Sequence, residues 1–259
     1  MWQAIFTRDN SIEEKKDAVL ENGVPGQRRN PGTSGWHSRG YLPHFESCEA
    51  IQQVTFHLAD SVAKAVLQRL ESELKLVADE KRDVERRKRL DAWTDTGHGL
   101  CVLREPWIAE MVRGSLLAFD GKRYRLLAWV VMPNHVHVLF QPMQGWTVAK
   151  IVASWKKFTA RRICDDLRKA GGRLAEGWRK AGEKVFGPVW HREYWDRNIR
   201  DRKHFEQVVR YIHRNPVKAG LVETEGSWLW SSAHCGDSGR VKYANLEIGV
   251  PGERGTRRA

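Results

Sequence analysis

Two apolar runs joined by a three-residue connection restrict the fold of this 259-residue chain more than any other feature. The runs, Tyr124 to Val131 and His135 to Gln141, are rich in the β-branched and aromatic residues that favour strands. Only Met132-Pro133-Asn134 separates them, which leaves room for no more than a tight turn. The sequence therefore predicts a pair of strands that form a hairpin.

Helical and strand-like patterns alternate on both sides of this hairpin. Val54, Phe56 and Leu58 alternate with polar residues, and Asp60 or Ser61 offers an N-cap for a long helix that follows. The other predicted elements are a helix from Pro106 to Phe119, an amphipathic helix marked by Val148, Ile151, Val152, Trp155 and Phe158, a strand from Val189 to Ile199, and a helix that Asp201 caps and Asn215-Pro216 ends. Strands interleaved with helices predict an α+β fold with a mainly antiparallel sheet and packed helices.

Changes in composition mark the expected limits of one domain, because the length allows a single substantial core. Residues 1–45 include the stretch GVPGQRRNPGTSGWHSRG, which predicts an arm or linker without regular structure. The domain is expected over residues 46–233, with a charged helical insertion at about 79–98 to which no chemistry can be assigned from the sequence. Residues 234–259 are predicted to be a flexible basic tail.

The positive charge of the chain is concentrated in one region. Of a formal net charge of +12, residues 147–220 account for +11, with 19 Lys and Arg against 8 Asp and Glu. Such a region favours a polyanionic partner, and no apolar run is long enough to span a membrane. The four cysteines form no CxxC pair, which disfavours a zinc knuckle or a disulfide framework. These features predict a nucleic-acid-binding protein of the cell interior.

His135 and His137 are the first candidates for chemistry. Side chains two apart in a strand point to the same face, so both imidazoles can bind one ion. A zinc hydrolase motif of the form HxHxDH is excluded locally, because Val138, Leu139 and Phe140 follow. An incidental pair of strand histidines is the alternative, and any third ligand must come from elsewhere in the chain.

Tyr211 and Asn215 are predicted to share one flank of the helix over residues 201–214, one turn apart and near its carbonyl end. The Asn215 amide oxygen could complete a metal shell while the Tyr211 phenol points to the same place. A phenol is a weak nucleophile at neutral pH and needs a metal-activated phosphate. The alternative for Tyr211 is a half-buried aromatic with a hydrated hydroxyl, and His204, on the same flank, is expected at the surface as a possible DNA contact.

Basic and aromatic residues elsewhere are candidates for DNA contacts. Cations bind phosphates and rings stack on unpaired bases. One set lies on the polar face of the amphipathic helix and the other in the predicted strand: Lys150, Lys157, Arg161, Trp190, Arg192, Tyr194 and Arg197. A solvated helix surface and ordinary core packing are the respective alternatives.

The segments LLAWVVMPNHVHVLF (126–140), VWHREYWDRNIRD (189–201) and VVRYIHRNPVKAGLV (208–222) resemble the REP-associated tyrosine transposases. These proteins are bacterial relatives of the single-tyrosine insertion-sequence transposases of the HUH superfamily. The resemblance extends over roughly residues 40–233 and includes GYLPHFES, VTFHLADS and SWLWSSA. It matches His135 and His137 to the HUH histidines, Tyr211 to the nucleophile and Asn215 to the polar residue one turn later.

The resemblance implies a ferredoxin- or RRM-like palm and a DNA nickase and strand transferase dependent on Mg²⁺ or Mn²⁺. The substrate would be single-stranded DNA with palindromic hairpin repeats, cleaved through a 5′-phosphotyrosine intermediate. A monomer in the bacterial cytoplasm, associated with the nucleoid, is expected. A domesticated hairpin-binding protein with vestigial cleavage is the alternative, whereas a small-molecule phosphohydrolase is disfavoured by the basic region and the lack of carboxylate ligands in the sequence motif.

Overall fold

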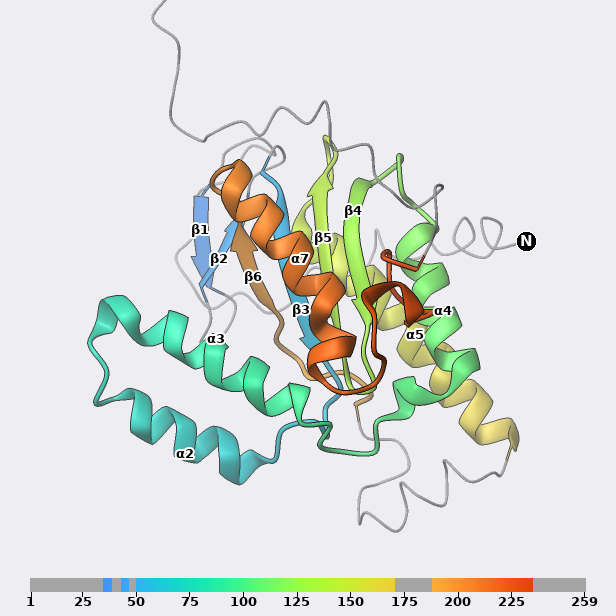
Figure 1. Ribbon diagram of the computed structural model, residues 1–259, viewed down its shortest axis with the longest axis horizontal. Helices are drawn as coiled ribbons and strands as arrows, with labels where there is room; N and C mark the ends of the chain where they lie inside the picture. Colours follow the sequence, from blue (N-terminus) through green and yellow to red (C-terminus); the bar gives the residue numbers. More distant parts are fainter. Residues whose placement is uncertain (1–34, 39–42, 47–49, 171–187, 235–259) are drawn as a thin grey trace, which may run out of the picture.

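The structure, a computed structural model, describes residues 35–38, 43–46, 50–170 and 188–234 (Figure 1). The described strands are β1 (Gly35–Ser38), β2 (Pro43–Glu46), β3 (Gln52–His57), β4 (Tyr124–Val131), β5 (His135–Pro142) and β6 (Trp195–Asn198). The described helices are α2 (Lys64–Leu74), α3 (Asp79–Asp95), α4 (Pro106–Leu117), α5 (Val148–Ala170) and α7 (Arg202–Lys218), with short 3₁₀ turns at Val102–Arg104 and Glu225–Ser227.

Four strands form one antiparallel sheet in the order β4-β5-β3-β6. The chain crosses from β3 to β4 through α2, α3 and α4, and from β5 to β6 through α5, so the two crossovers interleave. This is the split βαβ arrangement of ferredoxin-like folds. The predicted α+β class is therefore confirmed, and the predicted hairpin forms β4 and β5 with β5 inside the sheet.

Helices cover both faces of this sheet (Figure 1). Val136, Val138 and Phe140 of β5 point to one face, where they pack against α4 and α5 around Trp155. Leu139 points to the other face and packs beneath α7, with Val208 and Ile212. Because side chains alternate along a strand, His135 and His137 lie on the α7 face with Leu139.

The long helix predicted after β3 is two helices, α2 and α3, which form a hairpin at the side of the sheet (Figure 1). The N-cap of α2 is Ala63 and not the expected Asp60 or Ser61. The hydroxyl of Ser61 donates instead to the carbonyl of Leu58. The Arg86 guanidinium donates to both carboxylate oxygens of Glu71 at 2.9 and 3.0 Å, which ties the two helices together. The predicted apolar spacing is nevertheless used, since its five residues all pack in one cluster, Val62, Val66, Leu70, Leu74 and Val77.

Three other local predictions differ from the structure. The predicted strand over residues 189–199 is β6 only at Trp195–Asn198, because the chain bends at Arg192, between an isolated bridge of Trp190 with Leu58 and the start of β6. Helix α7 has the expected Asp201 cap, whose carboxylate accepts from the His204 amide at 2.7 Å, but continues through Pro216 to Lys218. His204 is buried at 5% exposure rather than at the surface, with its Nδ1 facing the Arg200 amide.

The expected arm is irregular in sequence, yet Gly35–Ser38 pairs antiparallel with Pro43–Glu46. These two strands form through backbone pairing with each other, and the composition of either segment alone does not reveal such pairing. Residues 1–34 and 39–42 of the expected arm, and residues 235–259 of the expected tail over 234–259, lie outside the described residues. Within the described part, the Cys101 thiol forms no disulfide, and none of the helices could span a membrane.

Candidate active site

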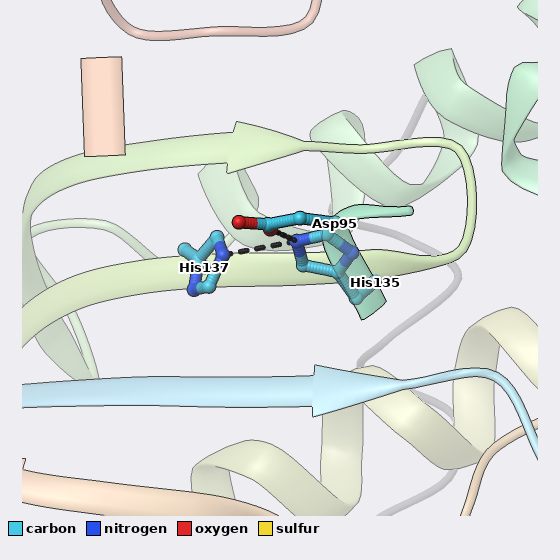
Figure 2. A group of neighbouring side chains, drawn as sticks. All are labelled: Asp95, His135 and His137. Carbon is cyan, nitrogen blue, oxygen red and sulfur yellow. Dashed lines mark hydrogen bonds and ion pairs between the residues drawn. The ribbon is translucent and has the colours of Figure 1, made fainter. Parts of the chain in front are cut away.

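The two predicted metal-binding histidines lie side by side on β5, both fully buried on the face covered by α7. Their Nε2 atoms are 3.0 Å apart (Figure 2). The sheet holds this spacing, because β5 pairs on one side with β3 and on the other with β4. The strand geometry expected from the sequence is therefore present, with both imidazoles directed to one point.

Neighbouring side chains hold the other ring nitrogen of each histidine. Asn134 uses its Nδ2 to donate to the carbonyls of Thr94 and His98, at 3.1 and 3.0 Å, so its Oδ1 must accept. The His135 Nδ1–H donates to that oxygen at 2.8 Å, which leaves the lone pair on Nε2. His137 Nδ1 contacts the Thr55 hydroxyl at 2.8 Å. When that nitrogen donates to Thr55, both Nε2 lone pairs face each other, an arrangement that a cation would stabilise.

Burial keeps both imidazoles neutral. It lowers the pKa of His135 to about 4, with the Asp95 carboxylate acting in the opposite direction. Burial also lowers the pKa of His137 well below its usual value, and the nearby His135 adds to this effect. Because a metal binds the neutral form of imidazole, both groups are ready to act as ligands at physiological pH.

Asp95, the last residue of α3, completes the cluster and was not predicted from the sequence. Its Oδ1 lies 3.6 Å from His135 Nε2, and the ligand atoms of Asp95, His135 and His137 all lie within 4.8 Å of one another (Figure 2). The segment 79–98, to which no chemistry was assigned, thus brings a carboxylate to the histidines. The sequence of this segment gave no local signal for the role of Asp95.

Tertiary contacts fix the end of α3 at this place. Lys218, in the last turn of α7, donates to Asp95 Oδ2 at 2.5 Å. The chain then leaves α3 through Gly99, whose φ of +88° favours glycine and where a Cβ would lie 2.8 Å from the Asp60 carbonyl oxygen. The next amide, Leu100 N–H, donates to the Asp60 carboxylate at 2.7 Å. The loop after α3 is therefore held against the end of β3.

Tyr211 approaches the histidine pair from α7. Its ring packs edge-on against His137, with ring centroids 5.3 Å apart. Burial raises the pKa of the Tyr211 phenol, and the nearby negative charge of Asp91 raises it further. The hydroxyl makes no well-formed hydrogen bond to the described residues, although Asn215 and Asp91 are close enough to affect its pKa. The phenol is therefore neutral.

Asn215 lies one turn after Tyr211 and is fully buried. Its Nδ2 donates to the Tyr211 carbonyl at 3.4 Å, while its Oδ1 has no hydrogen-bond partner among the described residues. The helix does not end here as expected, since the Asn215 carbonyl accepts from the Ala219 amide. A buried amide oxygen without a partner is costly, and a cation would satisfy it.

The donor set fits a divalent cation. The imidazole nitrogens of His135 and His137 and the carboxylate oxygen of Asp95 lie within 4.8 Å of one another and are the kinds of ligand that Mn²⁺ accepts. The amide oxygen of Asn215, one turn after Tyr211, is of a kind that also suits Mg²⁺. Asp95 Oδ1 and Asn215 Oδ1 are both buried without hydrogen-bond partners among the described residues. The absence of partners at these two oxygens supports a cation site independently of the sequence motif.

The candidate DNA-contacting residues do not gather at this cluster. Lys150, Lys157 and Arg161 are exposed on α5, which covers the opposite face of the sheet. Trp190 lies in the core, and its Nε1–H donates to Thr159 at 2.9 Å. The alternative of ordinary core packing is therefore confirmed for Trp190. Arg192 is largely exposed, whereas Tyr194 and Arg197 are half-buried.

Comparison with known proteins finds a family model and relatives that match part of the chain. Residues 108–215, which contain His135, His137, Tyr211 and Asn215, match the family model described as "Transposase IS200 like". A REP-associated tyrosine transposase of Haemophilus influenzae is 30% identical over 112 residues, which cover 43% of this chain and 60% of the relative. Another, from Escherichia coli, is 24% identical over 131 residues, or 48% of this chain and 64% of the relative.

The chain thus spans less than two thirds of these curated relatives. A solved structure, described as a REP-associated tyrosine transposase bound to a REP hairpin, is similar over 77% of this chain and 82% of its own, with 17% identity and a TM-score of 0.41. The family model and the two relatives confirm the resemblance found in the sequence: over the matched residues the chain is similar to the REP-associated tyrosine transposases.

Proposed function

We propose that the protein is a metal-dependent endonuclease and strand transferase that acts on single-stranded DNA with palindromic hairpin repeats. The observation that carries this proposal is the contact of the Tyr211 ring with His137, one of two buried histidines with Nε2 atoms 3.0 Å apart. A tyrosine nucleophile and a pair of metal-binding imidazoles are the two parts that such strand cleavage requires.

His135, His137 and Asn215 would hold Mg²⁺ or Mn²⁺, which would polarise the oxygens of the scissile phosphate. The Tyr211 phenol oxygen attacks the phosphorus, a 5′-phosphotyrosine ester forms, and the bond from phosphorus to the 3′ oxygen breaks. The phenol proton leaves Tyr211, and a proton is delivered to the departing 3′ oxygen, so a free 3′-hydroxyl results without any ATP. Attack by a 3′-hydroxyl on the phosphotyrosine would reverse these bonds and join two strands.

The surroundings of Tyr211 suit this role. Because burial and Asp91 raise its pKa, the phenol stays protonated in the free protein, so its proton must leave during the attack on the phosphate. The packing against His137 fixes the ring beside the histidines, so that nucleophile and phosphate can meet with little further ordering.

The substrate class rests on the charge and the relatives. The surplus of +11 over residues 147–220 favours a polyanion, and both curated relatives are described as REP-associated tyrosine transposases. Lys150, Lys157, Arg161, Arg192, Tyr194 and Arg197 remain candidates for contacts to DNA outside the cleavage site. A hairpin with a single-stranded extension is the corresponding test substrate.

The proposal is tested with Tyr211→Phe and a labelled hairpin oligonucleotide in the presence of Mn²⁺. We expect the variant to bind the hairpin but to form no covalent protein–DNA adduct in a denaturing gel. The matched control is Tyr124→Phe, which removes the same oxygen from a tyrosine buried on the other face of the sheet and should keep the adduct.

An adduct that persists in Tyr211→Phe would exclude this tyrosine as the nucleophile. If the wild-type protein binds hairpins tightly but forms no adduct at any junction with Mg²⁺ or Mn²⁺, the protein is a hairpin-binding protein with vestigial cleavage. Turnover of small phosphate esters would point instead to a phosphohydrolase.

A further inference from the structure

We propose that Asp95, carried to the site by the charged helix α3, is a direct ligand of the cation and that Lys218 positions it. This inference rests on the proposed function, because it assigns a further ligand to the same cation. It also gives the segment 79–98 a role in the active site.

The first argument is the position of one carboxylate oxygen. Asp95 Oδ1 lies 3.6 Å from His135 Nε2 and belongs to a group of ligand atoms within 4.8 Å of one another. The Asp95 side chain is only 9% exposed, and Oδ1 has no hydrogen-bond partner among the described residues. A buried carboxylate oxygen without a partner costs free energy, and a cation beside both imidazoles would remove that cost.

The second argument is that the two carboxylate oxygens of Asp95 have different surroundings. Oδ2 accepts a hydrogen bond from Lys218 at 2.5 Å, so this contact orients the carboxylate and leaves Oδ1 toward the histidines. Ligand carboxylates in metal sites are commonly held by such a second partner. Lys218 belongs to α7, the helix of Tyr211 and Asn215, so helices α3 and α7 meet at the cation.

The third argument is that one side chain controls both a histidine and the end of α3. The Asn134 amide orients His135 through its oxygen and holds the carbonyls of Thr94 and His98 through its nitrogen. Thr94 and His98 flank Asp95 in sequence. Hydrogen bonds of Asn134, in the turn between β4 and β5, therefore help to set the position of Asp95 relative to His135, in addition to the ion pair between Asp95 and Lys218.

A carboxylate ligand has a chemical consequence. Imidazole binds Zn²⁺ well, whereas carboxylate oxygen favours harder cations such as Mn²⁺ and Mg²⁺. Asp95 also adds the only negative charge in this group of three residues. We therefore expect Asp95 to shift the preference of the site from Zn²⁺ toward Mn²⁺.

The experiment measures binding of Mn²⁺ and of Zn²⁺ to the full chain without DNA, by isothermal titration calorimetry. Asp95→Asn should weaken Mn²⁺ binding by about tenfold or more and weaken Zn²⁺ binding less. Lys218→Met, which keeps the carboxylate but removes its partner, should weaken Mn²⁺ binding by a smaller factor. The matched control is Glu85→Gln, the same acid-to-amide change at a half-buried ion pair with Arg89 on α3, and this variant should bind Mn²⁺ as the wild type does.

His137→Ala separates the two proposals. If it abolishes Mn²⁺ binding while Asp95→Asn binds normally, Asp95 is only part of an ion pair between helices, and this inference fails alone. If His137→Ala also binds normally, the metal centre of the proposed function fails. Thermal unfolding in EDTA reports whether each variant is folded.

A measurement on the wild-type protein covers the case in which Asp95→Asn does not fold. With ¹³C-labelled aspartate, substoichiometric Mn²⁺ should broaden the Asp95 carboxylate resonance much more strongly than that of Asp201, the cap at the far end of α7. Equal broadening of the two resonances would overturn the assignment.

Discussion

Thr55 on β3 holds His137 on β5 across the sheet, with 2.8 Å between the threonine hydroxyl and Nδ1 of the imidazole. The two residues are 82 positions apart in sequence and directly opposite in the strand register. Both are buried, so the contact is protected from water. The backbone pairing of the two central strands thus determines how one proposed ligand presents its Nε2 to the cluster.

Thr55→Val should therefore weaken the proposed cation site without changing the sheet. Valine has nearly the same shape but leaves His137 Nδ1 without its partner, so the ring loses its fixed orientation. We expect Mn²⁺ binding and adduct formation to fall by about 10- to 100-fold. The free energy of unfolding should fall by about 1–2 kcal/mol, as measured by urea denaturation in EDTA.

Thr159→Val is the matched control for this change. Thr159 is also buried and hydrogen-bonded, but lies on α5 at the other face of the sheet, where it accepts from Trp190. The Thr159→Val variant should show a similar decrease in the free energy of unfolding but should bind Mn²⁺ as the wild type does. Equal Mn²⁺ binding by Thr55→Val and the wild type would show that the hydroxyl does not matter for the site.

Asn134→Ala should release the end of α3 as well as the His135 ring. The change removes the donors to the carbonyls of Thr94 and His98 and the acceptor of His135 Nδ1–H. Loss of these buried bonds should lower the free energy of unfolding by about 2–4 kcal/mol. Hydrogen exchange followed by mass spectrometry should show faster exchange in peptides that cover residues 94–100, whereas unchanged exchange there would contradict this anchoring role.

The stability of the metal-free protein should decrease as the pH falls below the ordinary histidine range, and His57 is one cause. Its ring is stacked between His191 and Trp195, at centroid distances of 4.6 and 5.0 Å, and its Nε2 has no hydrogen-bond partner among the described residues. Burial lowers the pKa of His57 to about 3 from its usual 6.5, and His191 lowers it further. The unfolded chain therefore binds a proton at His57 before the folded protein does.

The sign follows from this difference. The contribution of neutral His57 is fully present above pH 6.5 and is lost as the pH falls toward about 3, at about 1.4 kcal/mol per pH unit. His135 and His191, whose pKa values are also lowered, add to the slope. Urea unfolding in EDTA between pH 7.5 and 5 should show a smaller slope in His57→Gln, by about one proton. An unchanged slope would mean that His57 does not titrate in this way.

Local sequence patterns determined the elements that carry the site. The apolar runs around Met132-Pro133-Asn134 predicted β4 and β5 within one residue, and their alternation placed His135 and His137 on one face. Helical spacing put Tyr211 and Asn215 one turn apart, and Asp201 was correctly identified as the cap of α7. These features depend on residues within a few positions of one another, so the sequence was sufficient for them.

The tertiary structure decided which distant residues meet at the site. Asp95 contacts Lys218 over 123 positions, and Asn134 reaches Thr94 over 40. Nothing in the mixed charges of residues 79–95 indicates that Asp95, rather than another acid of this segment, meets the histidines. Likewise, the basic face of α5 was recognisable from its spacing, but not its place on the opposite side of the sheet. Hydrophobic periodicity specifies which side of an element is buried, whereas strand order and helix packing specify what it is buried against.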